Sequence, residues 1–173
     1  MADYYKVLFQ EDEHLGVGQT VEQTGLFFLP DAGKIENWKP IVLELRNGDY
    51  PDYLASNLGC RPCSERLKAI LTARASPSDS LQWLDVLVKK QGEERRYSIL
   101  HFPEPPNVLD KKETTFAGDF VVKAVLSRDA AAGHQVFAYP KCGCLPLFIS
   151  DEVMCRIQAD KCTGMEISKA RMA

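Results

Sequence analysis

The fold of this chain is decided by six segments: CSERLKAIL (63–71), LQWLDVLV (81–88), RYSILHFPEPPNVLD (96–110), GHQVF (133–137), LFISDEVMCRI (147–157) and TGMEI (163–167). Some of these have helical periodicity and others are rich in β-formers. The two kinds are grouped along the chain and do not alternate as βαβ units. This segregation predicts a single α+β domain over residues 1–173, with a mainly antiparallel sheet.

Two main helices are predicted, at about residues 64–74 and 151–159. Each has apolar residues at helical spacing, which gives one face that can be buried. These residues are Leu67, Ile70 and Leu71 in the first helix and Val153, Met154 and Ile157 in the second. Ser64 and Ser150 precede the two helices, and serine is a favoured N-cap because its hydroxyl accepts a backbone hydrogen bond.

Strands are predicted on both sides of the first helix. They lie at Tyr4–Phe9, Ile41–Leu45, 81–88, 97–102, 121–126, 135–139 and Met165–Ile167. Two of these strands, 81–88 and 97–102, are joined by a short polar loop and are expected to form an antiparallel hairpin. Single glycines and prolines interrupt residues 10–40, so the amino-terminal third is expected to be irregular.

The charge of the chain argues against nucleic acid, and its short apolar runs argue against a membrane span. The formal net charge is −3, and the densest basic cluster, at 89–96, is interrupted by glutamates, whereas phosphate binding needs clustered lysine and arginine. Acidic residues, including Glu11-Asp12-Glu13, would suit a basic partner such as a nuclease toxin, or they form an ordinary soluble surface with a net charge away from zero. No secretory signal or long apolar run is evident, so the protein is expected in the cytosol.

The cysteines leave a chemical alternative open. Cys60 and Cys63 form a CxxC pair and Cys142 and Cys144 form a CxC pair. Four thiolates are a ligand set for tetrahedral zinc, and a CxxC pair also occurs in thiol-redox sites. CxC is a poorer zinc spacing than CxxC. The cysteines are therefore expected to be reduced structural thiols, and no cofactor is expected.

An enzyme is not expected. His101 and His134 are suited by chemistry to act as general bases, and Cys63 or Cys144 to act as nucleophiles. The spacing of these residues does not link any of them into a catalytic arrangement.

The order and spacing of the six segments resemble a family of small bacterial immunity proteins encoded beside polymorphic toxins. The resemblance covers about residues 38–167. It implies a cytosolic, non-catalytic α+β protein that binds a cognate toxin domain and neutralises it, with no catalytic residues. Cys60 and Cys63 depart from the family pattern, in which a plain apolar residue precedes the SERLK helix, and this leaves a local metal or structural role open.

A loop-borne set of acidic and aromatic residues is the expected surface for the toxin, because aromatic side chains dominate binding hot spots. These residues are expected to be exposed. They are Glu36, Trp38, Asp49, Tyr50, Asp52 and Tyr53.

Overall fold

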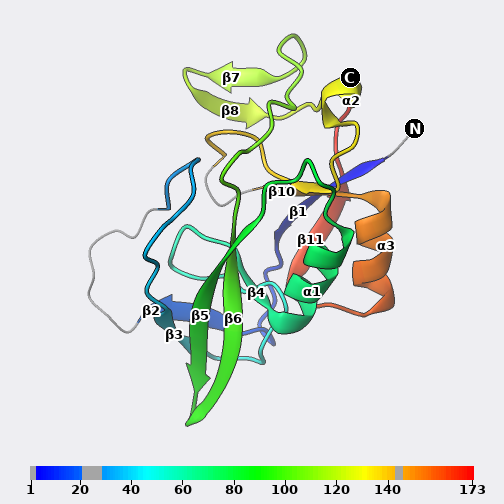
Figure 1. The fold of residues 1–173 in the computed structure, drawn as a ribbon. Coiled ribbons are helices and arrows are strands. Elements are labelled where there is room, and N and C mark those ends of the chain that lie inside the picture. The colour runs from blue at the N-terminus through cyan, green and yellow to red at the C-terminus, as the bar shows by residue number, and fades with distance from the viewer. Residues whose placement is uncertain (1–2, 21–28, 143–145) are drawn as a thin grey trace.

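The first of two main sheets brings the two ends of the chain together. The computed structural model describes residues 3–20, 29–142 and 146–173. The sheet has the order β11-β1-β10-β9, with every pair antiparallel (Figure 1). Its strands are β1 (Tyr4–Phe9), β9 (Val136–Phe137), β10 (Leu147–Ser150) and β11 (Met165–Lys169). The strands predicted at Tyr4–Phe9 and near Met165 are confirmed.

The second sheet is built around the predicted hairpin. Its order is β2-β3-β5-β6-β4, and only its β3–β5 pair is parallel. The strands are β2 (Val17–Thr20), β3 (Ile41–Arg46), β4 (Pro62–Ser64), β5 (Gln82–Lys90) and β6 (Glu93–His101). The expectation that residues 10–40 are wholly irregular is therefore wrong, because β2 lies among them. Strand β4 was also not expected.

Both predicted helices are confirmed, and they cover one face of the first sheet (Figure 1). They are α1 (Glu65–Arg74) and α3 (Asp151–Ala159), and a third, short helix is α2 (Arg128–Ala131). The Ser64 hydroxyl accepts a hydrogen bond from the Leu67 N–H, and the Ser150 hydroxyl accepts one from the Val153 N–H. The predicted apolar faces of both helices are buried in one core with Val7, Leu147 and Ile149.

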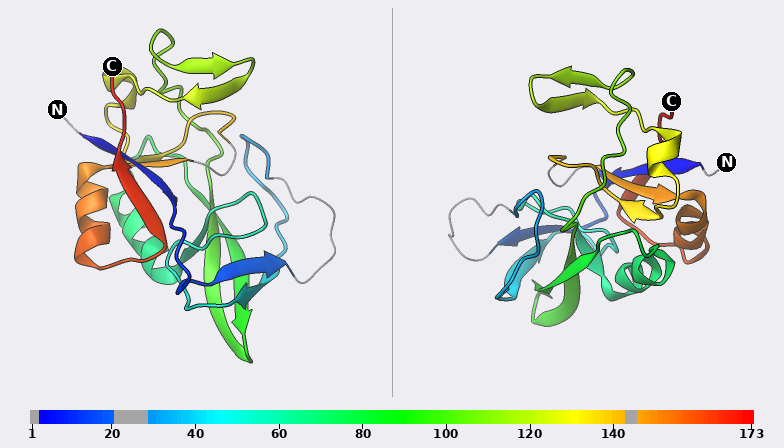
Figure 2. Two further views of the ribbon diagram at one scale, coloured as in Figure 1. Left: turned by 180° about the vertical axis from the view of Figure 1, so that it is seen from behind. Right: turned by 45° about the horizontal axis from the view of Figure 1, so that its top comes forward.

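The segment from β7 (Thr115–Ala117) to β9 differs from the prediction. Residues 121–126 and 135–139 are not two successive strands of one sheet. Strand β8 (Phe120–Lys123) pairs with β7, and α2 separates this hairpin from β9. The β7–β8 hairpin is a separate two-stranded sheet (Figure 2), and Val121 of β8 packs against the core that contains Phe148 of β10. The fold is an α+β domain with mostly antiparallel sheets. None of its described helices is both long and apolar enough to cross a membrane.

Candidate partner-binding groove

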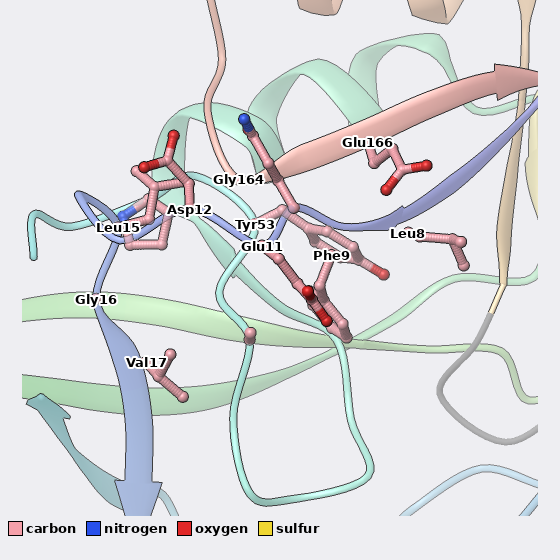
Figure 3. A pocket seen from close by; sticks show the side chains of 13 residues that line it. Leu8, Phe9, Glu11, Asp12, Leu15, Gly16, Val17, Tyr53, Gly164 and Glu166 are labelled. Carbon is pink, nitrogen blue, oxygen red and sulfur yellow. The ribbon is translucent and has the colours of Figure 1, made fainter.

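An open groove lies where β1 ends, β2 begins and the chain turns before β11 (Figure 3). Its volume is about 670 Å³. The residues that line it are Leu8, Phe9, Gln10, Glu11, Asp12, Leu15, Gly16, Val17, Pro51, Tyr53, Ala55, Gly164 and Glu166. We call this the acidic groove, for the reason given below.

The floor of the acidic groove is aromatic and firmly held. The rings of Phe9 and Tyr53 are stacked, with centroids 4.3 Å apart and an interplanar angle of 20°. The Tyr53 N–H donates to the carbonyl of Thr163 at 3.1 Å, and the Gln10 N–H donates to that of Gly164 at 3.0 Å. These backbone bonds fix both sides of the stack to the same turn, so the half-buried Phe9 ring is held on the buried Tyr53 ring in position for contact with an apolar group.

Three carboxylates surround this floor: Glu11, Asp12 and Glu166 (Figure 3). All three residues are exposed, and none forms an ion pair within the part of the chain that the structure describes. The described lining contains no lysine or arginine. The groove therefore presents negative charge beside apolar surface, which suits binding of a basic protein surface.

Two residues of the predicted surface set are buried. Asp52 is 6% exposed and Tyr53 is 1% exposed, so the expectation that they are exposed is wrong. The segment that carries them runs beneath the turn at Thr163, whose N–H donates to the Asp52 carboxylate at 2.8 Å. Tyr53 nevertheless reaches the acidic groove as part of its floor.

Asp49 and Tyr50 lie beside the tip of the β5–β6 hairpin. The Lys90 ammonium is 3.8 Å from the Asp49 carboxylate, and the Arg95 guanidinium lies 4.0 Å from the centre of the Tyr50 ring. The Tyr50 hydroxyl donates to the Glu93 carbonyl at 3.3 Å. Local cations therefore balance this part of the predicted set.

Glu36 and Trp38 lie at the other end of β3. Glu36 is exposed, whereas Trp38 is half-buried and its indole N–H donates to the Asp85 carbonyl at 2.9 Å. Asp85 and Lys90 are five residues apart on β5, which corresponds to about 17 Å of strand. The six predicted residues therefore do not form one continuous surface.

The predicted cysteine set is only partly brought together. Cys60 and Cys142 line one cavity of about 270 Å³, together with Arg61 and His101. Cys63 is fully buried in the core under α1, and this burial raises the pKa of its thiol. Cys144 lies outside the described residues. Among the residues that are described, no three His, Cys, Asp or Glu side chains are grouped so as to hold a metal ion.

The two histidines considered as bases have structural contacts. His101 Nε2 lies 2.8 Å from the Gly33 carbonyl oxygen. His134 Nδ1 lies 2.9 Å from the Asp79 carboxylate. Asp79 also accepts hydrogen bonds from the backbone N–H groups of Gln135 and Val136, both at 3.0 Å. The His134–Asp79 pair therefore joins the loop after α1 to the start of β9.

The predicted surface set missed the acidic groove, because it shares only Tyr53 with the residues that line it. The run Glu11-Asp12-Glu13 was an available signal, whereas Phe9 and Glu166 meet it only through the pairing of β1 with β11. Neither protein-family models nor curated proteins give a significant match to this sequence.

Proposed function

We propose that this chain is an immunity protein, which binds a cognate bacterial toxin domain in the cytosol and neutralises it without catalysis. The observation that carries the proposal is the acidic groove, with its stacked Phe9–Tyr53 floor and its three exposed carboxylates. The order of the six sequence segments, which resembles that of immunity proteins, supports the same function.

The acidic groove offers a protein partner both a rigid apolar contact and electrostatic attraction. An aromatic floor fixed by backbone hydrogen bonds loses little conformational freedom when a partner side chain packs on it. Carboxylates around the floor attract a basic surface and increase the association rate. A toxin that acts on nucleic acid has a basic face of this kind, and an inhibitor that covers this face excludes the nucleic acid.

The experiment begins with recovery of the tagged protein from its native cells, at low and at moderate salt. We expect a toxin domain encoded beside this chain to co-purify, and co-expression to restore growth of cells that produce the toxin. The affinity of the purified pair is expected to fall with salt, because exposed charges are screened.

Two variants of equal charge test the groove. The first, Glu11→Gln/Asp12→Asn/Glu166→Gln, removes the carboxylates that surround the floor. The matched control, Asp31→Asn/Asp85→Asn/Glu104→Gln, removes three exposed carboxylates elsewhere. We expect the first to weaken toxin binding about tenfold and the control to change it less than about twofold. Equal losses in both variants would show that only net charge matters and would remove the groove from the proposal.

A zinc or thiol-redox domain is the second candidate, because Cys60 and Cys142 line the same cavity. Under this hypothesis Cys60, Cys63, Cys142 and Cys144 would supply the thiolates that bind zinc or react in thiol-redox chemistry. Metal analysis of protein purified without chelator distinguishes the two functions. About one zinc per chain, lost in a Cys60→Ser/Cys142→Ser variant, would favour this candidate.

A further inference from the structure

A second groove, with the opposite charge, lies between β8 and the face of the first sheet that α1 and α3 do not cover. Its volume is about 600 Å³. It is lined by Lys6, Leu8, Val121, Val122, Lys123, Ala124, Tyr139, Pro146, Phe148, Lys169, Ala170 and Arg171. We call this the basic groove. No carboxylate occurs among the described residues that line it, and it meets the acidic groove at Leu8.

Three of its cations have no ionic partner in the described chain. They are Lys6, Lys123 and Arg171, while Lys169 is paired with Asp3 at 2.8 Å. Of the ten lysines and arginines on the strands of the second sheet and on the helices, seven form ion pairs, as Lys89 does with Glu94. The basic groove therefore concentrates uncompensated positive charge next to apolar side chains, which suits an acidic ligand with apolar groups.

Strand β8 forms one wall of the basic groove. Strand β8 belongs to a two-stranded sheet, and in the described chain its only strand partner is β7. Beyond β8 the chain closes onto the carboxyl terminus, where the Leu126 N–H donates to the Arg171 carbonyl at 2.8 Å. This bond holds the end of β8 beside the carboxyl-terminal residues that line the groove.

The side chains near this edge are apolar and exposed. Phe120 is 78% exposed and Val122 is 67% exposed, the two largest values among the large apolar residues that the structure describes. Residues two apart in a strand lie on the same face, so the two side chains form one apolar strip. A free strand edge beside such a strip is the arrangement to which an extended peptide adds as a further strand.

We propose that the basic groove binds an extended, acidic segment of a protein partner, which adds to β8 as a third strand. The inference rests on the proposed function for the identity of that partner, the toxin. The four residues of β8 correspond to about 13 Å of strand, enough to pair with about four residues of the segment. Apolar residues of the segment pack on Val122, while its carboxylates meet Lys6, Lys123 and Arg171.

A nucleic acid fits this groove less well. Binding through phosphates requires a track of cations along the backbone, whereas here four cations are interspersed with apolar residues such as Leu8, Val121 and Val122. A strand edge also offers its N–H and C=O groups at the spacing of a peptide backbone. The observations therefore favour a polypeptide, and a nucleic acid becomes an outcome of the test.

The probe is a fluorescein-labelled, end-capped peptide of alternating aspartate and valine, eight residues long, tested with the full chain by fluorescence anisotropy. A peptide with lysine in place of aspartate is its control. We expect the acidic peptide to bind and the basic one not to bind. The variant Lys6→Gln/Lys123→Gln/Arg171→Gln should lose about tenfold in affinity for the acidic peptide, as expected for three exposed ion pairs.

A charge-matched variant, Lys34→Gln/Lys39→Gln/Lys161→Gln, removes three exposed cations elsewhere and should retain the affinity to within about twofold. Equal loss in the two variants, or binding of the basic peptide, would overturn the inference. Tighter binding of a single-stranded oligonucleotide than of the acidic peptide would overturn it as well.

Toxin binding separates this inference from the proposed function. If the native chain and the Lys6→Gln/Lys123→Gln/Arg171→Gln variant bind the toxin equally well, the basic groove is not used and only this inference fails. If the chain binds the acidic peptide but neither binds nor neutralises any toxin, the proposed function fails while the peptide site stands.

Discussion

The Asp52 carboxylate is held by the Arg66 guanidinium through two separate contacts. Arg66 Nε lies 3.1 Å from Oδ1 and Nη2 lies 2.5 Å from Oδ2. The Ser64 hydroxyl donates to Oδ1 at 2.6 Å, and the Thr163 N–H donates to Oδ2 at 2.8 Å. This one side chain therefore joins the start of α1 to the turn before β11, and through Tyr53 it supports the floor of the acidic groove.

Replacement of Asp52 by Asn should destabilise the fold without any direct effect on a partner surface. The amide keeps the shape of the side chain but removes the negative charge. Its NH2 group also replaces one of the two oxygens that accept hydrogen bonds from Arg66, Ser64 and Thr163, so some of these donors lose their acceptor beside a buried side chain. We expect a loss of about 2–3 kcal/mol in the free energy of unfolding, measured by urea denaturation. Asp49→Asn is the control: its side chain is 93% exposed, and the expected loss is below about 0.5 kcal/mol.

The stabilisation of the fold by the Asp52 carboxylate should decrease as the pH falls. Burial alone raises the pKa of this carboxyl, but hydrogen bonds from Arg66, Ser64 and Thr163 outweigh it and hold the pKa below its ordinary value of 3.8. A carboxyl whose pKa is lower in the folded state stabilises that state above the unfolded pKa of about 3.9, and this stabilisation is lost as pH falls through the folded pKa.

The measurement compares the native chain with Asp52→Asn by urea unfolding at several pH values. The difference between the two unfolding free energies should be constant from about pH 7 to pH 5 and should shrink below about pH 4. A difference that stays constant down to about pH 3 would contradict a charge-dependent role for Asp52.

Local sequence signals predicted the helices and the β5–β6 hairpin because the residues that define them are close together in the chain. Strand β2 depends instead on distant contacts. A Cβ atom on Gly16 would lie 2.6 Å from the Leu45 side chain, so glycine is needed there for close approach of β2 to β3. In the sequence, Gly16 and Gly18 have the appearance of strand breakers, and the strand was missed for that reason.

The site was predicted less well than the fold, for a related reason. The sequence predicts Asp52 on the surface as part of an acidic and aromatic loop, and a carboxylate is rarely buried without partners. Its partners Ser64 and Arg66 lie 12 and 14 residues further along the chain, and Thr163 lies 111 residues away. The fold alone brings these groups together. The same holds for Phe9 and Tyr53, whose stack becomes visible only when β1 is placed beside the loop after β3.

The cysteines should differ in reactivity according to burial. Cys155 is exposed on α3, whereas Cys60 and Cys63 are buried. Burial also raises the pKa of Cys162 to about 11, which leaves little thiolate near neutral pH. With a maleimide at about pH 7, we expect Cys155 to be modified first and Cys60 and Cys63 only after unfolding.

Peptide mapping by mass spectrometry identifies the modified positions in this experiment. A Cys155→Ser variant is the control and should remove the fast phase alone. Modification of Cys63 in the folded chain at the rate of Cys155 would contradict its place in the core under α1.

Gly164 and Gly92 offer a matched test of the turn that supports the acidic groove. Both have φ near +86°, a conformation that favours glycine, but their surroundings differ. A Cβ atom on Gly164 would lie 2.2 Å from the Tyr53 carbonyl oxygen and 2.9 Å from Pro51, whereas one on Gly92 would meet nothing within 4 Å. Gly92→Ala should therefore lower the free energy of unfolding only by the cost of the positive φ, about 1 kcal/mol.

Alanine at Gly164 carries the same conformational cost and also displaces the backbone of Tyr53. We expect Gly164→Ala to lower the unfolding free energy by about 3 kcal/mol or more in urea denaturation. If the variant still folds, its toxin affinity should fall further than that of Gly92→Ala, because the Phe9–Tyr53 stack depends on the position of this turn. Equal stabilities of the two variants would mean that the Tyr53 backbone moves at no cost, and the groove floor would then not be preorganised.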